Sequence, residues 1–134
     1  MNLLRLGWNS YITKKDPISL IHFVTNKCNA RCKHCFIDFD HPDAFKGELN
    51  LEEIEKLTKS FGKPLLNINL TGGEPFLRKD FFEIVRLYFE NAGVESAYIT
   101  TNGMFTDLTK EFLDKFIAAG IKGNVILSFS IESI

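Results

Sequence analysis

Long apolar segments are absent from this 134-residue sequence. No run approaches the roughly eighteen consecutive apolar residues that a membrane-spanning helix needs. Residues 1–11 are interrupted by Arg5, Gly7, Trp8 and Asn9 before the apolar core of a signal peptide could form. The sequence therefore predicts a cytoplasmic protein with no membrane partner.

An excess of charge of one sign is absent as well. Sixteen Lys and Arg residues stand against seventeen Asp and Glu residues, which gives a net charge of −1, and the two signs are mixed along the chain. A surface that binds nucleic acid usually shows in the sequence as a basic block or stripe. We therefore expect no nucleic-acid partner.

A fourth cysteine is missing. The three cysteines present, Cys28, Cys32 and Cys35, have the spacing C-x₃-C-x₂-C. A disulfide would pair two of them and strand the third, and a reducing compartment disfavours disulfides in any case. Three thiolates at this spacing can converge on one metal centre. A [4Fe–4S] cluster normally takes four cysteine ligands, so three would leave one iron open to a small molecule.

Two other interpretations of the cysteines remain open at this point. The loop could be a zinc knuckle with His41 as the fourth ligand, because His34 adjoins Cys35 and would have difficulty turning toward the same ion. The cysteines could instead be unrelated core residues, since cysteine often packs as a small hydrophobe. A pure electron-transfer protein is disfavoured, because it would prefer a fully ligated cluster.

The cysteine spacing, with the aromatic residue His34 just before the last cysteine, resembles the radical S-adenosylmethionine (SAM) superfamily. This resemblance implies that Cys28, Cys32 and Cys35 hold a [4Fe–4S] cluster and that SAM binds the remaining iron through its amino and carboxylate groups. The reduced cluster would cleave SAM to methionine and a 5′-deoxyadenosyl radical, which abstracts hydrogen from a substrate. The resemblance further implies an electron donor such as a flavodoxin or ferredoxin, and it places His34 near the adenine.

Strand and helix patterns alternate along the chain after the first twenty residues. The sequence predicts strands at 20–25, 65–71, 96–101 and 124–131, and helices at 51–61, at 80–91 and from a cap at Thr106 or Asp107 to residue 119. Such alternation is typical of an α/β fold with a parallel sheet. The family resemblance implies a partial (β/α) barrel, of which about the first four strands and three helices are present.

The first predicted strand, 20–25, is apolar almost throughout, which is the pattern of a strand buried on both faces. We expect His22 within it to be a hydrogen-bonded core residue. The cysteine loop follows at the end of this strand, where parallel α/β folds bind ligands. Residues 1–19 have no clean period and are predicted to be an N-terminal extension that packs on the outside of a core domain at 20–134.

The other candidate residues follow the later strands. Gly72-Gly73-Glu74-Pro75 ends the second strand, and its glycines would let a ligand approach the backbone closely. By resemblance to the family, Gly72, Gly73 and Glu74 bind the amino group of SAM. The same resemblance assigns the methionine part to Thr101 and Asn102, and the ribose and carboxylate to Ser130 and Glu132. Taken alone, both the Gly-Gly and the Asn-Gly sequences could be simple turns.

The last predicted strand would be an apolar sheet edge with unpaired backbone groups. We therefore expect this chain to be the N-terminal part of a longer radical SAM enzyme, whose substrate is an unidentified small molecule, such as a cofactor precursor, or a peptide. The alternative function is a non-catalytic zinc or iron–sulfur binding module.

Overall fold

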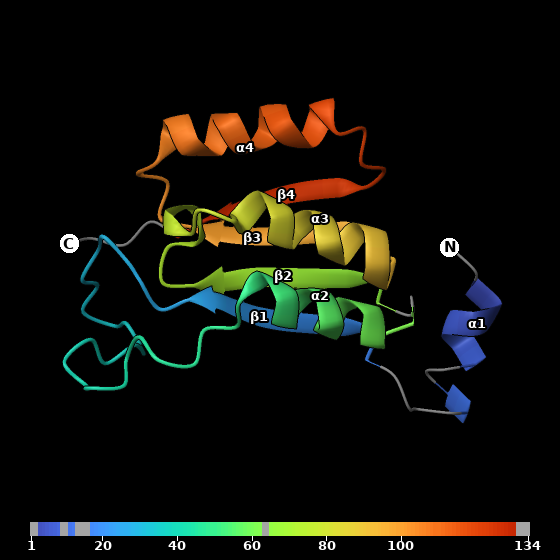
Figure 1. Cartoon of the computed structure of the whole chain (residues 1–134), viewed down its shortest axis with the longest axis horizontal. Coiled ribbons are helices and arrows are strands. Elements are labelled where there is room, and N and C mark those ends of the chain that lie inside the picture. Colours follow the sequence, from blue (N-terminus) through green and yellow to red (C-terminus); the bar gives the residue numbers. More distant parts are fainter. Residues whose placement is uncertain (1–2, 9–10, 13–16, 63–64, 131–134) are drawn as a thin grey trace.

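The structure is a computed structural model that describes residues 3–8, 11–12, 17–62 and 65–130. These residues form a four-stranded parallel sheet in the order β1-β2-β3-β4 (Figure 1). The strands are β1 (Ser19–Thr25), β2 (Asn67–Gly72), β3 (Ser96–Thr101) and β4 (Asn124–Phe129). The helices are α1 (Leu3–Trp8), α2 (Leu51–Ser60), α3 (Phe81–Ala92) and α4 (Thr106–Ala118), with a short 3-10 helix, η2 (Pro75–Leu77), after β2. The predicted α/β class and the alternation of elements are confirmed.

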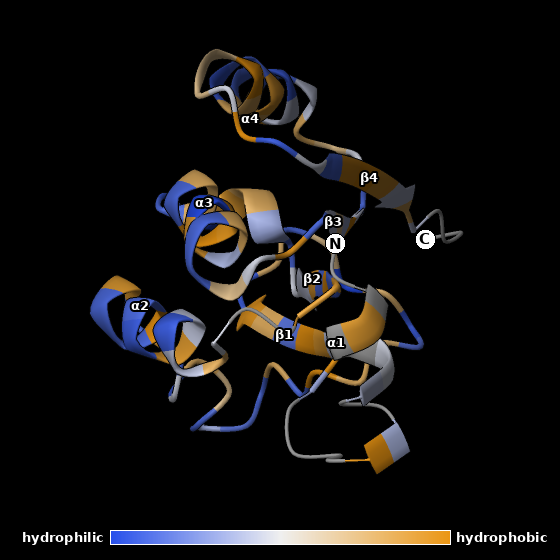
Figure 2. Cartoon of the chain, turned by 90° about the vertical axis from the view of Figure 1, so that its right-hand side faces the viewer, coloured by the Kyte–Doolittle hydropathy of each residue, from blue (hydrophilic) through white to orange (hydrophobic). Residues whose placement is uncertain are grey.

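The helices that connect the strands cover one face of the sheet. Figure 2 looks along the strands and shows α2 and α3 side by side on this face. Alternate strand residues point into the core beneath the helices and are fully buried, among them Val24, Ile68, Leu70, Ala97 and Ile99. No helix among the described residues has the length and apolar composition needed to cross a membrane.

The opposite face of the sheet is uncovered in the described part of the chain. Ile21, Asn69, Tyr98 and Ile126 lie in one register row across all four strands, and Ile21 is 61% exposed. The prediction that the first strand is buried on both faces is therefore wrong. An uninterrupted apolar run shows that both faces of a strand are apolar, but it does not show that a layer packs on each.

Helix ends follow the sequence signals in all but one case. Asn50 and Glu53 form the predicted capping box, with the Glu53 amide donating to Asn50 Oδ1 at 3.0 Å. Gly93 ends α3 in the left-handed conformation, as predicted, with φ of 72°. The predicted cap of α4 is wrong, because the helix starts after Phe105, which provides no side-chain cap. Phe105 packs against the core, and this packing fixes the entry of the chain into α4.

His22 is a core histidine, as predicted. Its Nδ1 atom lies 3.0 Å from the hydroxyl oxygen of Tyr88 on α3. Burial, and next the positive charge of Arg78, lower the pKa of His22 to about 4. Burial also raises the pKa of Tyr88. Both side chains are therefore neutral over the usual pH range, and the pair joins β1 to α3.

The N-terminal extension contains α1, and several large apolar side chains described in the extension are exposed. Leu4 is 86% exposed, and Trp8, Tyr11 and Ile12 are exposed as well. That the extension packs on the outside of the core domain stays a prediction.

Candidate functional site

The cysteine loop lies at the edge of the sheet toward which the strands point (Figure 1). Between the end of β1 and the start of α2 the chain contains turns but no helix or strand. Cys28 and Cys32 are half-buried, Cys35 is exposed, and none of the three takes part in a disulfide. His34 is exposed on the same loop. The residues that follow β2 and β3 contact this loop, because the carboxyl ends of parallel strands lie at the same edge of a sheet.

The glycine turn after β2 fastens the base of the cysteine loop. The amide of Gly73 donates to the carbonyl of Thr25 at 2.6 Å, and the amide of Glu74 donates to that of Lys27 at 2.8 Å. A Cβ atom on Gly72 would lie 2.2 Å from the Thr25 oxygen, and one on Gly73 would lie 2.2 Å from the Lys27 oxygen. Glycine is thus required at both positions because the backbone of the cysteine loop crosses the turn there.

Glu74 joins the end of β2 to the end of β3. Its side chain is fully buried, and its Oε1 accepts a 2.8 Å hydrogen bond from the Thr101 hydroxyl and one from the Phe76 amide. Its Oε2 accepts a 2.8 Å bond from the backbone amide of Asn102. The structure therefore brings Glu74, Thr101 and Asn102 together, as the sequence predicted for one site. The carboxylate of Glu74 and the hydroxyl of Thr101, which is 2% exposed, both make their bonds inside the protein.

Asn102 extends this connection to the cysteine loop. Its Nδ2 atom lies 2.9 Å from Asn29 Oδ1 and 4.0 Å from the sulfur of Cys28. The Cys28 sulfur also accepts a hydrogen bond from the amide of Ala30, at 3.4 Å. Of the predicted residues, Cys28, Glu74, Thr101 and Asn102 thus form one continuous set of contacts.

The end of β4 reaches the same edge through its backbone. The amide of Ser130 donates to the carbonyl of Thr101 at 2.9 Å, and the Ser130 side chain is exposed. Glu132, the other residue predicted on this strand end, lies outside the described residues.

Two residues that sequence reasoning missed hold the cysteine loop to the domain. Glu48 accepts hydrogen bonds from the Thr25 hydroxyl, at 2.8 Å, and from the Asn26 amide, at 3.0 Å. No sequence signal distinguishes Glu48 from the other acidic residues of its loop.

Arg78 is the second missed residue, and its side chain is only 10% exposed. It donates to the carbonyls of Val24 at 2.5 Å and Leu49 at 2.6 Å, and it pairs with Asp80 at 2.8 Å. This hydrogen bond from Arg78 lowers the pKa of Asp80. The Arg-x-Asp sequence directly after η2 is a signal that could have indicated it.

No three His, Cys, Asp or Glu side chains among the described residues are gathered closely enough to hold a metal ion between them. This holds both for the three cysteines and for the alternative set that includes His41. The chemistry of the donors nevertheless fits an iron–sulfur cluster. Three thiols outside disulfides lie on one loop, and two N–H groups lie at the sulfur of Cys28, as is common for the ligand sulfurs of such clusters.

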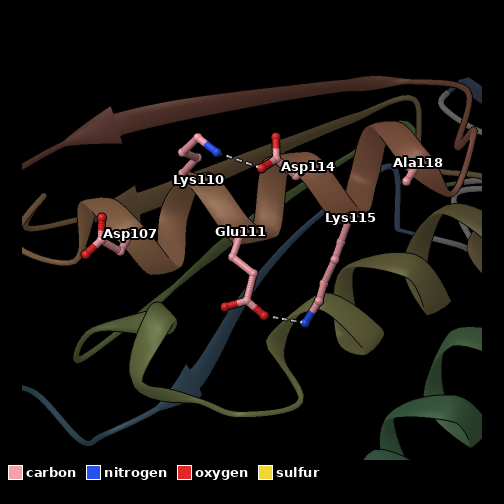
Figure 3. A pocket seen from close by; sticks show the side chains of 6 residues that line it. All are labelled: Asp107, Lys110, Glu111, Asp114, Lys115 and Ala118. Carbon is pink, nitrogen blue, oxygen red and sulfur yellow. Dashed lines mark hydrogen bonds and ion pairs between the residues drawn. The ribbon is translucent and has the colours of Figure 1, made fainter.

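Two hollows on the described surface are lined by residues of α4 and, in the second, also by the segment 76–82. Figure 3 shows one of about 520 Å³ on α4, where Lys110 pairs with Asp114 and Lys115 pairs with Glu111. The other, of about 320 Å³, lies between η2 and α4 over Phe76 and neighbouring aromatic rings. Neither contains a residue that the sequence predicted for the site, and the first is lined by side chains that pair with one another along one helix.

Comparison with known proteins identifies one matching family and several similar proteins that share one name. The family model of the Radical SAM superfamily matches residues 23–134. A GTP 3',8-cyclase of Haemophilus ducreyi is 43% identical over 82 residues, which are 60% of this chain and 24% of the relative. The Yersinia pestis protein of the same name is 39% identical over 83 residues, 60% of this chain and 25% of the relative.

A GTP 3',8-cyclase of Tolumonas auensis is 35% identical over 113 residues, 83% of this chain and 32% of the relative. The chain thus spans about a quarter to a third of the length of these curated relatives.

Proposed function

Because this chain belongs to the radical SAM superfamily, we propose that it binds a [4Fe–4S] cluster and SAM as part of an enzyme that starts hydrogen abstraction from a substrate. One observation carries the proposal. The cysteine loop, the glycine turn after β2 and the end of β3 meet at one edge of the sheet, joined through Glu74 and Asn102. In parallel α/β folds this edge is the usual place for a ligand.

The proposed cluster ligands are Cys28, Cys32 and Cys35. Three thiolates leave one iron without a protein ligand, and SAM takes this position in the proposal. When bound, the reduced cluster supplies the electron that cleaves SAM and yields the 5′-deoxyadenosyl radical. The part of this chain is to hold and orient the two cofactors, while the radical chemistry is theirs.

We assign the SAM ammonium group to the backbone of Gly72 and Gly73, which is partly exposed, together with the negative charge of Glu74. Since the Glu74 carboxylate is enclosed, its further part in the proposal is to hold the ends of β2 and β3 in register at the site. The remaining proposed contacts are Thr101 and Asn102 with the methionine part, Ser130 and Glu132 with the ribose and carboxylate, and His34 with the adenine.

An electron donor is required by the proposed reaction, and a flavodoxin or ferredoxin would serve. Lys27, Arg31 and Lys33 are exposed on the cysteine loop. Positive charge around the ligand loop would favour the approach of a donor with an acidic surface.

The substrate in this proposal is a small molecule or a peptide. GTP is the first to test, because the similar proteins above are named GTP 3',8-cyclases. The formation of 5′-deoxyadenosine with and without GTP would decide whether this chain uses it.

The function is tested by anaerobic reconstitution with iron and sulfide, followed by SAM and a reductant. We expect about four irons and four sulfides per chain and the release of 5′-deoxyadenosine, measured by mass spectrometry. The variant with Cys28, Cys32 and Cys35 all changed to Ala is the control and should give neither. A protein that carries one zinc and no sulfide would instead support the non-catalytic binding module, and a loaded cluster without any 5′-deoxyadenosine would refute the proposed reaction.

A further inference from the structure

We propose that Asn102 is a positioning residue for the iron–sulfur cluster: its side-chain amide donates to the sulfur of Cys28 and raises the reduction potential of the cluster. This inference rests on the proposed function, because it takes Cys28 as a cluster ligand. It assigns Asn102 a role that is separate from contact with SAM.

The geometry places two N–H groups at the Cys28 sulfur. The Nδ2 atom of Asn102 lies 4.0 Å from it, at the long end of the range for a hydrogen bond to sulfur, and the Ala30 amide lies 3.4 Å from it. The Ala30 donor belongs to the cysteine loop itself. The Asn102 donor follows the end of β3, so a residue held by the sheet contacts a cysteine of the loop directly.

The orientation of the Asn102 carboxamide is fixed from both sides. Its Oδ1 accepts a 3.0 Å hydrogen bond from the Met104 amide, which leaves Nδ2 to face the cysteine loop. There Nδ2 donates to Asn29 Oδ1 at 2.9 Å, and the Nδ2 of Asn29 in turn lies 3.2 Å from the sulfur of Met104. The backbone of Asn102 is held by the buried carboxylate of Glu74. Asn29 therefore aims the Asn102 amide at Cys28.

A donor at this sulfur has a predictable effect on reduction. The reduced cluster carries one more negative charge than the oxidised cluster, and part of this charge lies on the sulfur atoms. An N–H group that points at a ligand sulfur stabilises the reduced form more than the oxidised form, so it raises the potential. Removal of the Asn102 amide should therefore make the cluster harder to reduce.

The test is a redox titration of the anaerobically reconstituted protein in the absence of SAM, followed by electron paramagnetic resonance. We expect Asn102→Ala to shift the midpoint potential to a more negative value. Asn29→Ala should produce a smaller shift of the same sign, and the double variant should match Asn102→Ala alone, because Asn29 acts through Asn102. Asn69→Ala, on the uncovered face of β2, is the matched control and should titrate like the unchanged protein.

A second variant covers the possibility that Asn102→Ala fails to fold. Asn102→Asp keeps the shape of the side chain and the acceptor for the Met104 amide but removes both N–H donors, so it should also shift the potential to a more negative value. Iron and sulfide contents establish that each variant is loaded. If the unchanged protein forms no cluster, the proposed function fails, and this inference fails with it. If loaded Asn102 variants titrate at the unchanged potential, the inference alone is overturned, even where SAM binding is weakened.

Discussion

Glu74 shows at the scale of one residue how a motif residue can serve a site from inside the protein. A carboxylate with no exposed surface is costly to bury unless its oxygens are hydrogen-bonded. Glu74 accepts three hydrogen bonds, from the Thr101 hydroxyl and from the amides of Phe76 and Asn102. The negative charge thus lies between two strand ends and fixes the backbone that adjoins the cysteine loop.

We predict that Glu74→Gln destabilises the protein by about 1–3 kcal/mol, because the new NH₂ group would face the Asn102 amide and leave a buried donor unsatisfied. Chemical denaturation measures the loss. Thr101→Val, which removes one neutral donor and keeps the shape of the side chain, should cost less than Glu74→Gln. Equal free energies of unfolding for Glu74→Gln and the unchanged protein would show that the hydrogen bonds of the Glu74 carboxylate do not stabilise the fold.

His22 gives a prediction about pH. Its pKa is lowered to about 4 in the folded protein from the ordinary value of 6.5, so the unfolded chain takes up this proton first as the pH falls. The contribution of His22 to the free energy of unfolding is therefore fully present above pH 6.5 and is lost as the pH falls toward 4. Denaturation at several pH values should show a steeper loss for the unchanged protein than for His22→Gln.

Tyr88→Phe provides the control for His22. It removes the hydroxyl partner of His22 but keeps the burial that is the main cause of its low pKa. We therefore expect Tyr88→Phe to have a lower free energy of unfolding at every pH, with the same loss between pH 6.5 and pH 4 as in the unchanged protein. Identical pH profiles for His22→Gln and the unchanged protein would disprove the prediction.

At the scale of elements, Arg78 holds together segments that are far apart in the sequence. Its guanidinium joins the end of β1, the loop before α2 and the segment after η2. This fork of donors fits several acceptors at once, which the single ammonium group of lysine cannot reproduce.

We predict that Arg78→Lys lowers the free energy of unfolding by about 1.5–3 kcal/mol, the usual cost of lost hydrogen bonds to a charged group. Arg86→Lys is the matched control, since Arg86 pairs with Glu83 and Glu90 on the surface and its substitution should cost less than about 1 kcal/mol. Urea denaturation of both variants gives the comparison, and similar losses for the two would refute the special role of Arg78.

Elements were predictable from the sequence where the signal is local. The strand at 96–101 and the capping box of α2 depend on neighbours a few residues away, and both have the predicted limits. The hydrogen bonds of Arg78 to Val24 and of Glu48 to Thr25 join residues that are 54 and 23 positions apart. Periodicity carries no information about such pairs, so both anchors of the cysteine loop were missed.

At the scale of the whole molecule, the sheet is covered on one face and open on the other. The order of the elements was enough to predict a parallel sheet whose carboxyl edge carries the motifs. It was not enough to predict which face is open, because Ile21 and Phe23 on the open face are as apolar as the core. Exposure depends on the layer packed above a strand, which the sequence of that strand does not contain.

Cluster binding should stabilise the whole domain if the proposed function is correct. A ligand that binds only the folded state raises stability by mass action, and the three cysteines would be held together on one centre. We predict that the reconstituted protein unfolds at a temperature several degrees above that of the apo protein, measured anaerobically by circular dichroism. The variant without the three cysteines should show no difference after the same treatment, and an equal unfolding temperature of loaded and apo protein would contradict the prediction.

The crossing of the cysteine loop over Gly72 and Gly73 limits how small a peptide mimic of this site can be. A synthetic peptide of residues 26–48 would carry all three thiols, but the glycine turn that holds the loop backbone at Lys27 and the Asn102 amide beside the Cys28 sulfur both come from outside that peptide. Such a peptide would lack the residue after β3 that lies beside one of its sulfurs. A mimic that keeps these contacts must therefore include the sheet as well as the cysteine loop.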